Sequence, residues 1–161
     1  MTDSQNTHPN LITKNEVRKA CSIEGDATDQ RLCRITAEFE QGFEFIEKYP
    51  RSVTMFGSAR FKEDNEHYAR ARELAKRITS ELGYAVVTGG GPGIMEAGNR
   101  GAQEGDGNSL GMNIELPHEQ VLNPYTTDSL GFHYFFSRKV SMTFSSEAYI
   151  YFPGGFGTMD E

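Results

Sequence analysis

The last nine residues, 153–161, contain groups that are well suited to chemistry. They read PGGFGTMDE and follow an apolar run, residues 148–152, that is typical of a buried strand. Three glycines within four positions let the backbone bend sharply and approach a ligand closely. Thr158 and Glu161 have the spacing of a capping box at a helix start. A strand, a glycine turn and a helix N-terminus in this order are typical of a phosphate site, because free N–H groups point at the anion.

Arg138 precedes the same apolar run, on a segment of about residues 133–144 that is expected to be helical. Consecutive elements usually lie side by side in an α/β fold, so Arg138 and Glu161 are expected to reach one crevice. Spacing alone also fits a plainer interpretation, in which Glu161 only caps a helix and Arg138 is a surface charge. Both interpretations stay open at this point.

Strands are expected to alternate with helices along most of the chain. Strands are predicted at residues 52–56, 84–88, 109–114 and 148–152, and helices at 65–82, from 94 onward and at 133–144. This order predicts an α/β fold, a Rossmann-like doubly wound parallel sheet with helices on both faces. Glycine turns follow three of the strands, at Gly57, at residues 89–93 and at residues 154–157. Ligands bind beyond the carboxyl ends of such strands, so the three turns are expected to converge on one crevice.

Two parts of the chain are expected to differ in order. Residues 1–28 are polar and aperiodic, and they are predicted to be a mobile N-terminal arm. Residues 29–161 are predicted to form an incomplete Rossmann-like domain, preceded at 29–49 by an amphipathic helix. This helix would either cover an edge of the sheet or contact another subunit. Its apolar residues recur at steps of three and four: Leu32, Ile35, Phe39, Phe43 and Ile46.

Composition excludes several classes of function. The net charge of −7 and the pI of about 5.1 argue against nucleic acid or an anionic membrane as the main partner. The N-terminus lacks the apolar segment of a signal peptide, so a soluble cytoplasmic protein is expected. Cys21 and Cys33 form no CxxC pair and no zinc spacing, and reduced thiols are expected. The four histidines show no metal-binding spacing.

Two common nucleotide motifs do not fit. A dinucleotide fingerprint needs G-x-G-x-x-G after the first strand, but Ile94 stands where the third glycine belongs, and this run follows the second strand. A Walker-type loop is excluded because the chain has no Gly-Lys pair. No G-x-S-x-G nucleophile elbow is present either.

Taken together, the motifs resemble those of the Lonely-guy-type phosphoribohydrolases, a family long labelled lysine decarboxylases. Residues 153–161 match its PGGxGTxxE motif, and residues 137–139 resemble the arginine–lysine segment that precedes it. Residues 89–97 resemble its first glycine loop, while the Gly57-Ser58 turn, residues 111–114 and residues 117–120 also fit. The resemblance covers about residues 50–161 and is closer to the larger bacterial members than to the compact plant type.

The resemblance implies hydrolysis of the N-glycosidic bond of a nucleoside 5′-monophosphate, either a cytokinin riboside monophosphate or AMP. It implies Arg138 and Glu161 as the catalytic residues. The phosphate would be held by Gly154, Gly155, Gly157 and Thr158. Other substrate contacts would come from Ser58, Gly90, Gly91, Glu96, Met112 and Lys139, with Glu96 on ribose hydroxyls. No cofactor is implied; pyridoxal phosphate would need a Schiff-base lysine, for which Lys139 is the candidate beside the motif.

Two further expectations accompany the enzyme hypothesis. The alternative is a non-catalytic nucleotide- or molybdenum-cofactor-binding carrier, which keeps the glycine loops but needs no Arg–Glu pair. The expected partner is a small-molecule nucleoside monophosphate, and a homodimer or larger homo-oligomer is expected of the full-length parent. Family members continue beyond the position of Glu161 with a helix and further strands, so the chain is expected to be a C-terminally truncated fragment.

Overall fold

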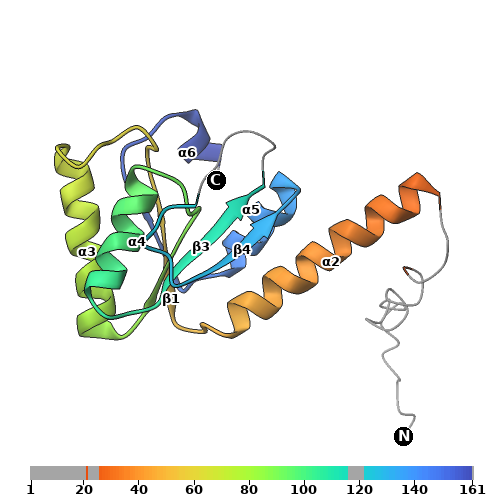
Figure 1. The fold of residues 1–161 in the computed structure, drawn as a ribbon, viewed down its shortest axis with the longest axis horizontal. Coiled ribbons are helices and arrows are strands. Elements are labelled where there is room, and N and C mark those ends of the chain that lie inside the picture. The colour runs from red at the N-terminus through yellow and green to blue at the C-terminus, as the bar shows by residue number, and fades with distance from the viewer. Residues whose placement is uncertain (1–20, 22–25, 116–121, 161) are drawn as a thin grey trace, which may run out of the picture. The chain divides into compact units, whose positions relative to one another are not determined.

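The structure is a computed structural model that describes residues 21, 26–115 and 122–160 (Figure 1). The chain divides into two units, Met1–Ala37 and Glu38–Glu161. Helix α2, Ala27–Glu47, contains the division and confirms the helix expected at 29–49. The arm predicted at residues 1–28 lies mostly outside the described residues and stays a prediction.

In the first unit, Cys21 and Cys33 form a disulfide, with their Cα atoms 5.3 Å apart. The prediction of reduced thiols is therefore wrong. Disulfide pairing depends on the distance and direction of the two Cβ atoms, which the spacing of cysteines along a chain does not give. None of the helices in the described part of the chain is long and apolar enough to cross a bilayer, and a cytoplasmic location stays a prediction.

The second unit contains a five-stranded sheet in which every neighbouring pair is parallel. The strand order is β4-β3-β2-β1-β5. This confirms the predicted parallel α/β sheet of Rossmann-like type. The strands are β1 (Ser52–Phe56), β2 (Ala85–Thr88), β3 (Ser109–Ile114), β4 (Asp128–Phe132) and β5 (Ala148–Tyr151).

Strand β4 was missed by the sequence prediction, which assigned no strand between residues 114 and 148. Its sequence, DSLGF, contains an aspartate and a glycine, which are depleted in strands, and it has no apolar run. It becomes a strand because it pairs along the edge of β3, from Leu110 opposite Asp128 to Ile114 opposite Phe132. The partner strand, and not local preference, decides its conformation.

Helices cover both faces of the sheet, as a doubly wound fold requires. Helices α3 (Glu66–Leu82) and α4 (Ile94–Glu104) lie on the same side of the sheet (Figure 1) and share one core cluster with alternate residues of β1 and β2. The opposite face packs against Phe45 of α2 and Met142 of α5 (Phe135–Phe144). The helix before the first strand therefore covers a face of the sheet through its second half.

The strand order fixes where a ligand can bind. The chain runs from β1 through β2 and β3 to β4 in one direction, and then returns to place β5 on the other side of β1. This reversal is a topological switch point, and the crevice of an open α/β sheet lies there, beyond the carboxyl ends of the two flanking strands. The turns after β1 and β5 are therefore expected to form the site.

The packing of α3 against α4 depends on a glycine. A Cβ added at Gly101 of α4 would lie 2.0 Å from the carbonyl oxygen of Arg72 on α3. The ends of α3 are also well defined, since the Asn65 side chain accepts from the N–H of His67 and Gly83 closes the helix with a φ of 67°. The two helices can thus lie close together and hold the start of α4 against the sheet.

We expect Gly101→Ala to lower the free energy of unfolding by about 1–3 kcal/mol, because the added methyl group overlaps the α3 backbone. Helix propensity alone predicts the opposite sign, a gain of up to about 1 kcal/mol. Gly155→Ala is the matched control, since a Cβ there meets nothing within 4 Å. Chemical denaturation of both variants checks this, and a Gly101→Ala variant as stable as the wild type would contradict it.

Candidate functional site

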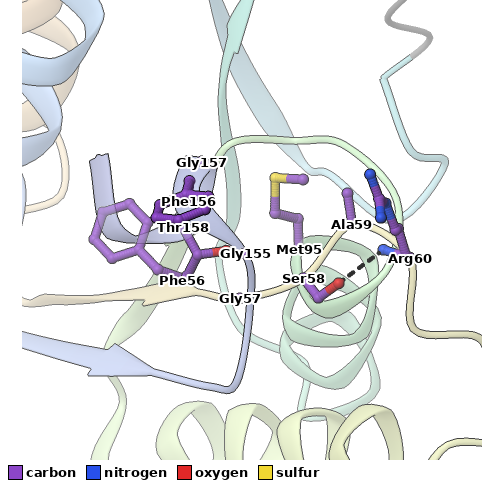
Figure 2. A pocket seen from close by; sticks show the side chains of 10 residues that line it. All are labelled: Phe56, Gly57, Ser58, Ala59, Arg60, Met95, Gly155, Phe156, Gly157 and Thr158. Atoms are coloured by element: carbon purple, nitrogen blue, oxygen red, sulfur yellow. Dashed lines mark hydrogen bonds between the residues drawn. The ribbon is translucent and has the colours of Figure 1, made fainter.

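A cavity of about 580 Å³ lies at the switch point, where β1 and β5 end (Figure 2). Figure 2 shows Met95, from the start of α4, between the loop after β1 and the turn after β5. The cavity is therefore built from three separate strand ends. Its lining consists of Phe56, Gly57, Ser58, Ala59, Arg60, Met95, Gly155, Phe156, Gly157 and Thr158.

Backbone hydrogen bonds join the three glycine turns. The N–H of Ser58 donates to the carbonyl oxygen of Pro153 at 3.2 Å, and the N–H of Ile94 donates to the carbonyl oxygen of Ser58 at 3.0 Å. Gly93, with a φ of 71°, has no room for a side chain, because a Cβ would lie 2.3 Å from the same Ser58 oxygen. The predicted convergence of the three turns is thus present, with Ser58 at its centre.

Helix α6, Phe156–Asp160, starts earlier than the capping-box prediction placed it. The carbonyl oxygen of Gly155 already accepts from the N–H of Thr158 at 3.1 Å and of Met159 at 3.3 Å. Thr158 therefore lies inside the first turn, and the prediction that it caps the helix is wrong. The physical reason is that the glycine supplies the first carbonyl acceptor of the helix, so the turn closes there.

Arg138 is buried, with 4% of its surface exposed, so the plainer interpretation of a surface charge is wrong. Its Nε donates to the carbonyl oxygen of Met112 at 2.7 Å. A Cβ on Gly89 would lie 2.3 Å from its Nη2 and 2.8 Å from the sulfur of Met95. The first glycine of the second loop therefore leaves space for the guanidinium group, which lies beside a residue of the cavity lining.

Glu161, the predicted catalytic carboxylate, lies outside the described residues. Its neighbour Asp160, however, forms an ion pair with Lys139, which follows Arg138 on α5. This pair joins the helix that carries the motif arginine to α6, which carries residues 156–160 of the PGGxGTxxE segment. It also engages the Lys139 ammonium group, whose predicted substrate contact stays untested.

A carboxylate from α2 caps α5. Glu38 accepts from the backbone N–H of His133 at 2.7 Å and of Tyr134 at 3.2 Å, and from the hydroxyl group of Ser137. These donors lie at the start of α5, where N–H groups have no helical partner and a negative charge is stabilising. Glu38 thus fixes the first turn of the helix that carries Arg138. Sequence reasoning missed this contact, because the partners are 95–99 residues apart.

Two buried asparagines fix the second glycine loop. The side-chain amide of Asn123 donates to the carbonyl oxygens of Gly90 at 3.1 Å and Gly91 at 3.0 Å, and to Oδ1 of Asn99 at 2.8 Å. Oδ1 of Asn99 also accepts from the Thr88 hydroxyl group at 2.6 Å. Sequence reasoning missed both asparagines, because the Asn123 contacts join residues 24–33 positions apart.

A second cavity, of about 570 Å³, adjoins the first. It contains Glu96, whose Oε1 accepts from the hydroxyl group of Tyr68 at 2.7 Å. The two cavities share Ala59 and Arg60. The second lining consists of Ala59, Arg60, Phe61, Lys62, Glu63, Tyr68, Pro92, Gly93 and Glu96.

The predicted site residues can be divided by the cavity that they line. Ser58, Gly155, Gly157 and Thr158 line the first cavity, and Glu96 lines the second. Gly154, Gly90, Gly91 and Met112 line neither. The Met112 side chain is completely buried in the core, so only its carbonyl oxygen reaches the site, by holding Arg138. Residues 117–120, part of the resemblance, lie outside the described residues.

Comparison with protein families agrees with the motifs and the fold. Residues 95–161 match the model of a family described as "Possible lysine decarboxylase". This part of the chain is similar to that lysine decarboxylase-like family. The match includes Arg138 and the whole PGGxGTxxE segment, so the resemblance inferred from the motifs is confirmed at this level. A comparison with curated proteins found no match.

Solved structures share the fold. A structural-genomics target is 24% identical with a TM-score of 0.57, over 68% of this chain and 64% of that one. The molybdenum cofactor carrier protein of Chlamydomonas reinhardtii is 24% identical with a TM-score of 0.56, over 69% and 67%. The molybdenum cofactor binding protein of Rippkaea orientalis is 17% identical with a TM-score of 0.54, over 68% and 66%. The chain thus spans about two-thirds of their lengths, and at these identities the likeness establishes the fold.

We expect Glu38→Ala to lower the free energy of unfolding by about 1–3 kcal/mol, because it leaves donors at the start of α5 without their acceptor. Glu38→Gln should cost less, since its amide oxygen still accepts. Glu47→Ala, which removes an exposed carboxylate from the same helix, is the control. Denaturant unfolding separates these variants, and equal midpoints for Glu38→Ala and Glu47→Ala would argue against the capping role.

The hydroxyl group of Tyr68 should ionise only at an unusually high pH. Burial, and then the hydrogen bond to Glu96, raises the pKa of Tyr68 from 10.0 to about 12. The folded state favours the neutral phenol, so this contribution to stability is complete below pH 10 and is lost as the pH rises through about 12. Ultraviolet titration of the seven tyrosines should show a late component that Tyr68→Phe removes. An unchanged titration in that variant would contradict the assignment.

Proposed function

We propose that this protein hydrolyses the N-glycosidic bond of a nucleoside 5′-monophosphate, AMP or a cytokinin riboside monophosphate, to a free base and ribose 5-phosphate. The observation that carries the proposal is the position of Arg138. It is buried beside the glycine loop, on a helix that the Lys139–Asp160 ion pair joins to the PGGxGTxxE segment. A buried cation next to that segment fits a site that binds an anionic substrate.

The first cavity has the properties that a phosphate group requires. Among the described residues of its lining there is no aspartate or glutamate, whereas Arg60 contributes a positive charge. Gly155, Gly157 and Thr158 line the same cavity, and Thr158 carries a hydroxyl group. Small residues let the phosphate oxygens approach the backbone donors closely. We therefore assign the 5′-phosphate to residues 155–158.

The chemistry needs a carboxylate near the anomeric carbon. Cleavage of an N-glycosidic bond passes through a state like an oxocarbenium ion, which a carboxylate stabilises or to which it directs a water molecule. We assign this role to Glu161, and to Arg138 the role of holding the substrate or orienting Glu161 through a charge-assisted contact. The water oxygen bonds to C1′, the C1′–N bond breaks, and the base leaves with a proton from the water.

A carrier without catalysis is the second candidate. Two of the structures that share this fold are described as molybdenum cofactor carrier or binding proteins. Cavities lined by glycine turns would also accept the phosphate group of such a ligand, and a carrier has no need of the Arg138–Glu161 pair. Hydrolysis is favoured here because Arg138 is buried against the glycine loop.

We expect Arg138→Ala and Glu161→Ala each to lower kcat for base release by about 10²–10³-fold, because each removes a charge that stabilises the transition state. Chromatography of free base from AMP and from isopentenyl-AMP measures this. Arg138→Lys keeps a positive charge at this buried position. If this variant folds but releases no base, the loss of turnover comes from the chemistry and not from folding. Arg70→Ala is the control, since this exposed arginine of α3 pairs with Glu66 at 3.1 Å.

Three outcomes separate the candidates. Loss of turnover in folded Arg138→Ala and Glu161→Ala, with Arg70→Ala unchanged, supports the hydrolase. Undiminished turnover in either variant overturns the assigned site. Tight nucleotide or cofactor binding by the wild-type protein, with no base released from either substrate, supports the carrier. The predicted homo-oligomer is an additional proposal that sedimentation of the same samples checks.

A further inference from the structure

Met95 lies where the first cavity meets the surroundings of Arg138. Its side chain lines this cavity, whereas Arg138 belongs to the described lining of neither cavity and has 4% of its surface exposed. A Cβ added to Gly89 would lie 2.3 Å from Nη2 of Arg138 and 2.8 Å from Sδ of Met95. The guanidinium group and the thioether therefore border the same space, and the thioether also borders the cavity.

The rest of the Met95 side chain lies along the second glycine loop. A Cβ on Gly91 would be 2.7 Å from Cε of Met95 and 3.4 Å from its sulfur. Figure 2 shows this side chain extended from the start of α4 into the space between the turn after β5 and the residues after β1. The glycines of the loop thus leave the room that the thioether occupies, beside the arginine and facing the cavity.

The neighbours of Arg138 differ in how easily they can move. The carbonyl oxygen of Met112, which accepts from Nε at 2.7 Å, belongs to the backbone of β3. Met95 contributes an unbranched side chain with three rotatable bonds, which adapts readily to its surroundings. Its sulfur is only a weak acceptor, whereas a phosphate oxygen forms a strong charge-assisted hydrogen bond with a guanidinium group. An anionic ligand therefore gains contact energy when it takes the place of the thioether.

We propose that the Met95 side chain covers Arg138 on the side of the first cavity, and that it moves aside when an anionic ligand in that cavity reaches the guanidinium group. The cover itself does not depend on the reaction, whereas its part in substrate binding rests on the proposed function. Met95 acts through Arg138 and is a positioning residue. The apparent affinity for the ligand is then reduced by the fraction of molecules in which Met95 covers Arg138.

Modification of arginine by phenylglyoxal measures the cover without any ligand. We expect Met95→Ala to speed the modification of Arg138 by at least about tenfold, since reactivity follows the fraction of time that a group is exposed. Met95→Ile keeps a large side chain that is stiff in a helix, so Arg138 should react no faster than in the wild type. Peptide mass spectrometry also reads Arg100, whose side chain is 21% exposed and whose rate should not change. Leu82→Ala, at an exposed position of α3, is the control variant.

Calorimetry with ribose 5-phosphate measures the effect on binding. This compound has the phosphate and the ribose of the proposed substrate and no base to release. Met95→Ala should lower its Kd by about 3–10-fold, because the ligand no longer has to displace a side chain. Met95→Ile should raise the Kd, because a stiff side chain cannot move aside as easily. A folding defect would weaken binding in both variants. In base release from AMP, the same changes should appear in KM and not in kcat.

The results separate this inference from the proposed function. Unchanged reactivity of Arg138 in folded Met95→Ala would overturn the cover, and so would a faster rate that Arg100 shares. Faster modification with unchanged affinity for ribose 5-phosphate would overturn the role in binding. If both effects are found but AMP releases no base, the hydrolase fails and the inference about Met95 stands. If base is released and Met95→Ala behaves like the wild type in both measurements, the hydrolase stands and this inference fails.

Discussion

A guanidinium group can be buried only where neighbouring atoms replace the water it loses, and this requirement organises the second unit of the protein. Arg138 meets it through the carbonyl oxygen of Met112, on β3, and through the space that Gly89 leaves after β2. Its helix is held at the first turn by Glu38 and tied to α6 through Lys139. Four segments that are distant in the sequence thus hold this side chain or the helix that carries it.

The glycine loops have a similar dependence on polar groups from elsewhere. Gly90 and Gly91 can turn sharply, but their carbonyl oxygens are held by the amide of Asn123. That amide is in turn linked to Asn99 and Thr88. A buried network of this kind is stable when its members are satisfied, and it specifies one arrangement of the loop. The loop is therefore preorganised by its partners more than by its own composition.

The two adjoining cavities are formed by different groups that meet at one edge of the sheet. Both are formed by the loop after β1, with Ala59 and Arg60 between them. The turn after β5 gives the first cavity Gly155, Gly157 and Thr158, and α3 and α4 give the second cavity its Tyr68–Glu96 pair. Parallel strands deliver these different groups to one edge of the sheet, on either side of one short loop.

The sequence by itself determined the class of fold, the positions of four of the five strands and the glycine turns at their carboxyl ends. These follow from local patterns, because apolar runs and glycine spacing depend on nearby residues alone. It also pointed to Arg138, through its place before the PGGxGTxxE motif. Only the tertiary structure decided that Arg138 is buried, that Glu38 and Asn123 support the site, that residues 128–132 form a strand, and that Cys21 meets Cys33. Each of these depends on a partner distant in the sequence or on the direction of a side chain, and no periodicity along a single chain records either one.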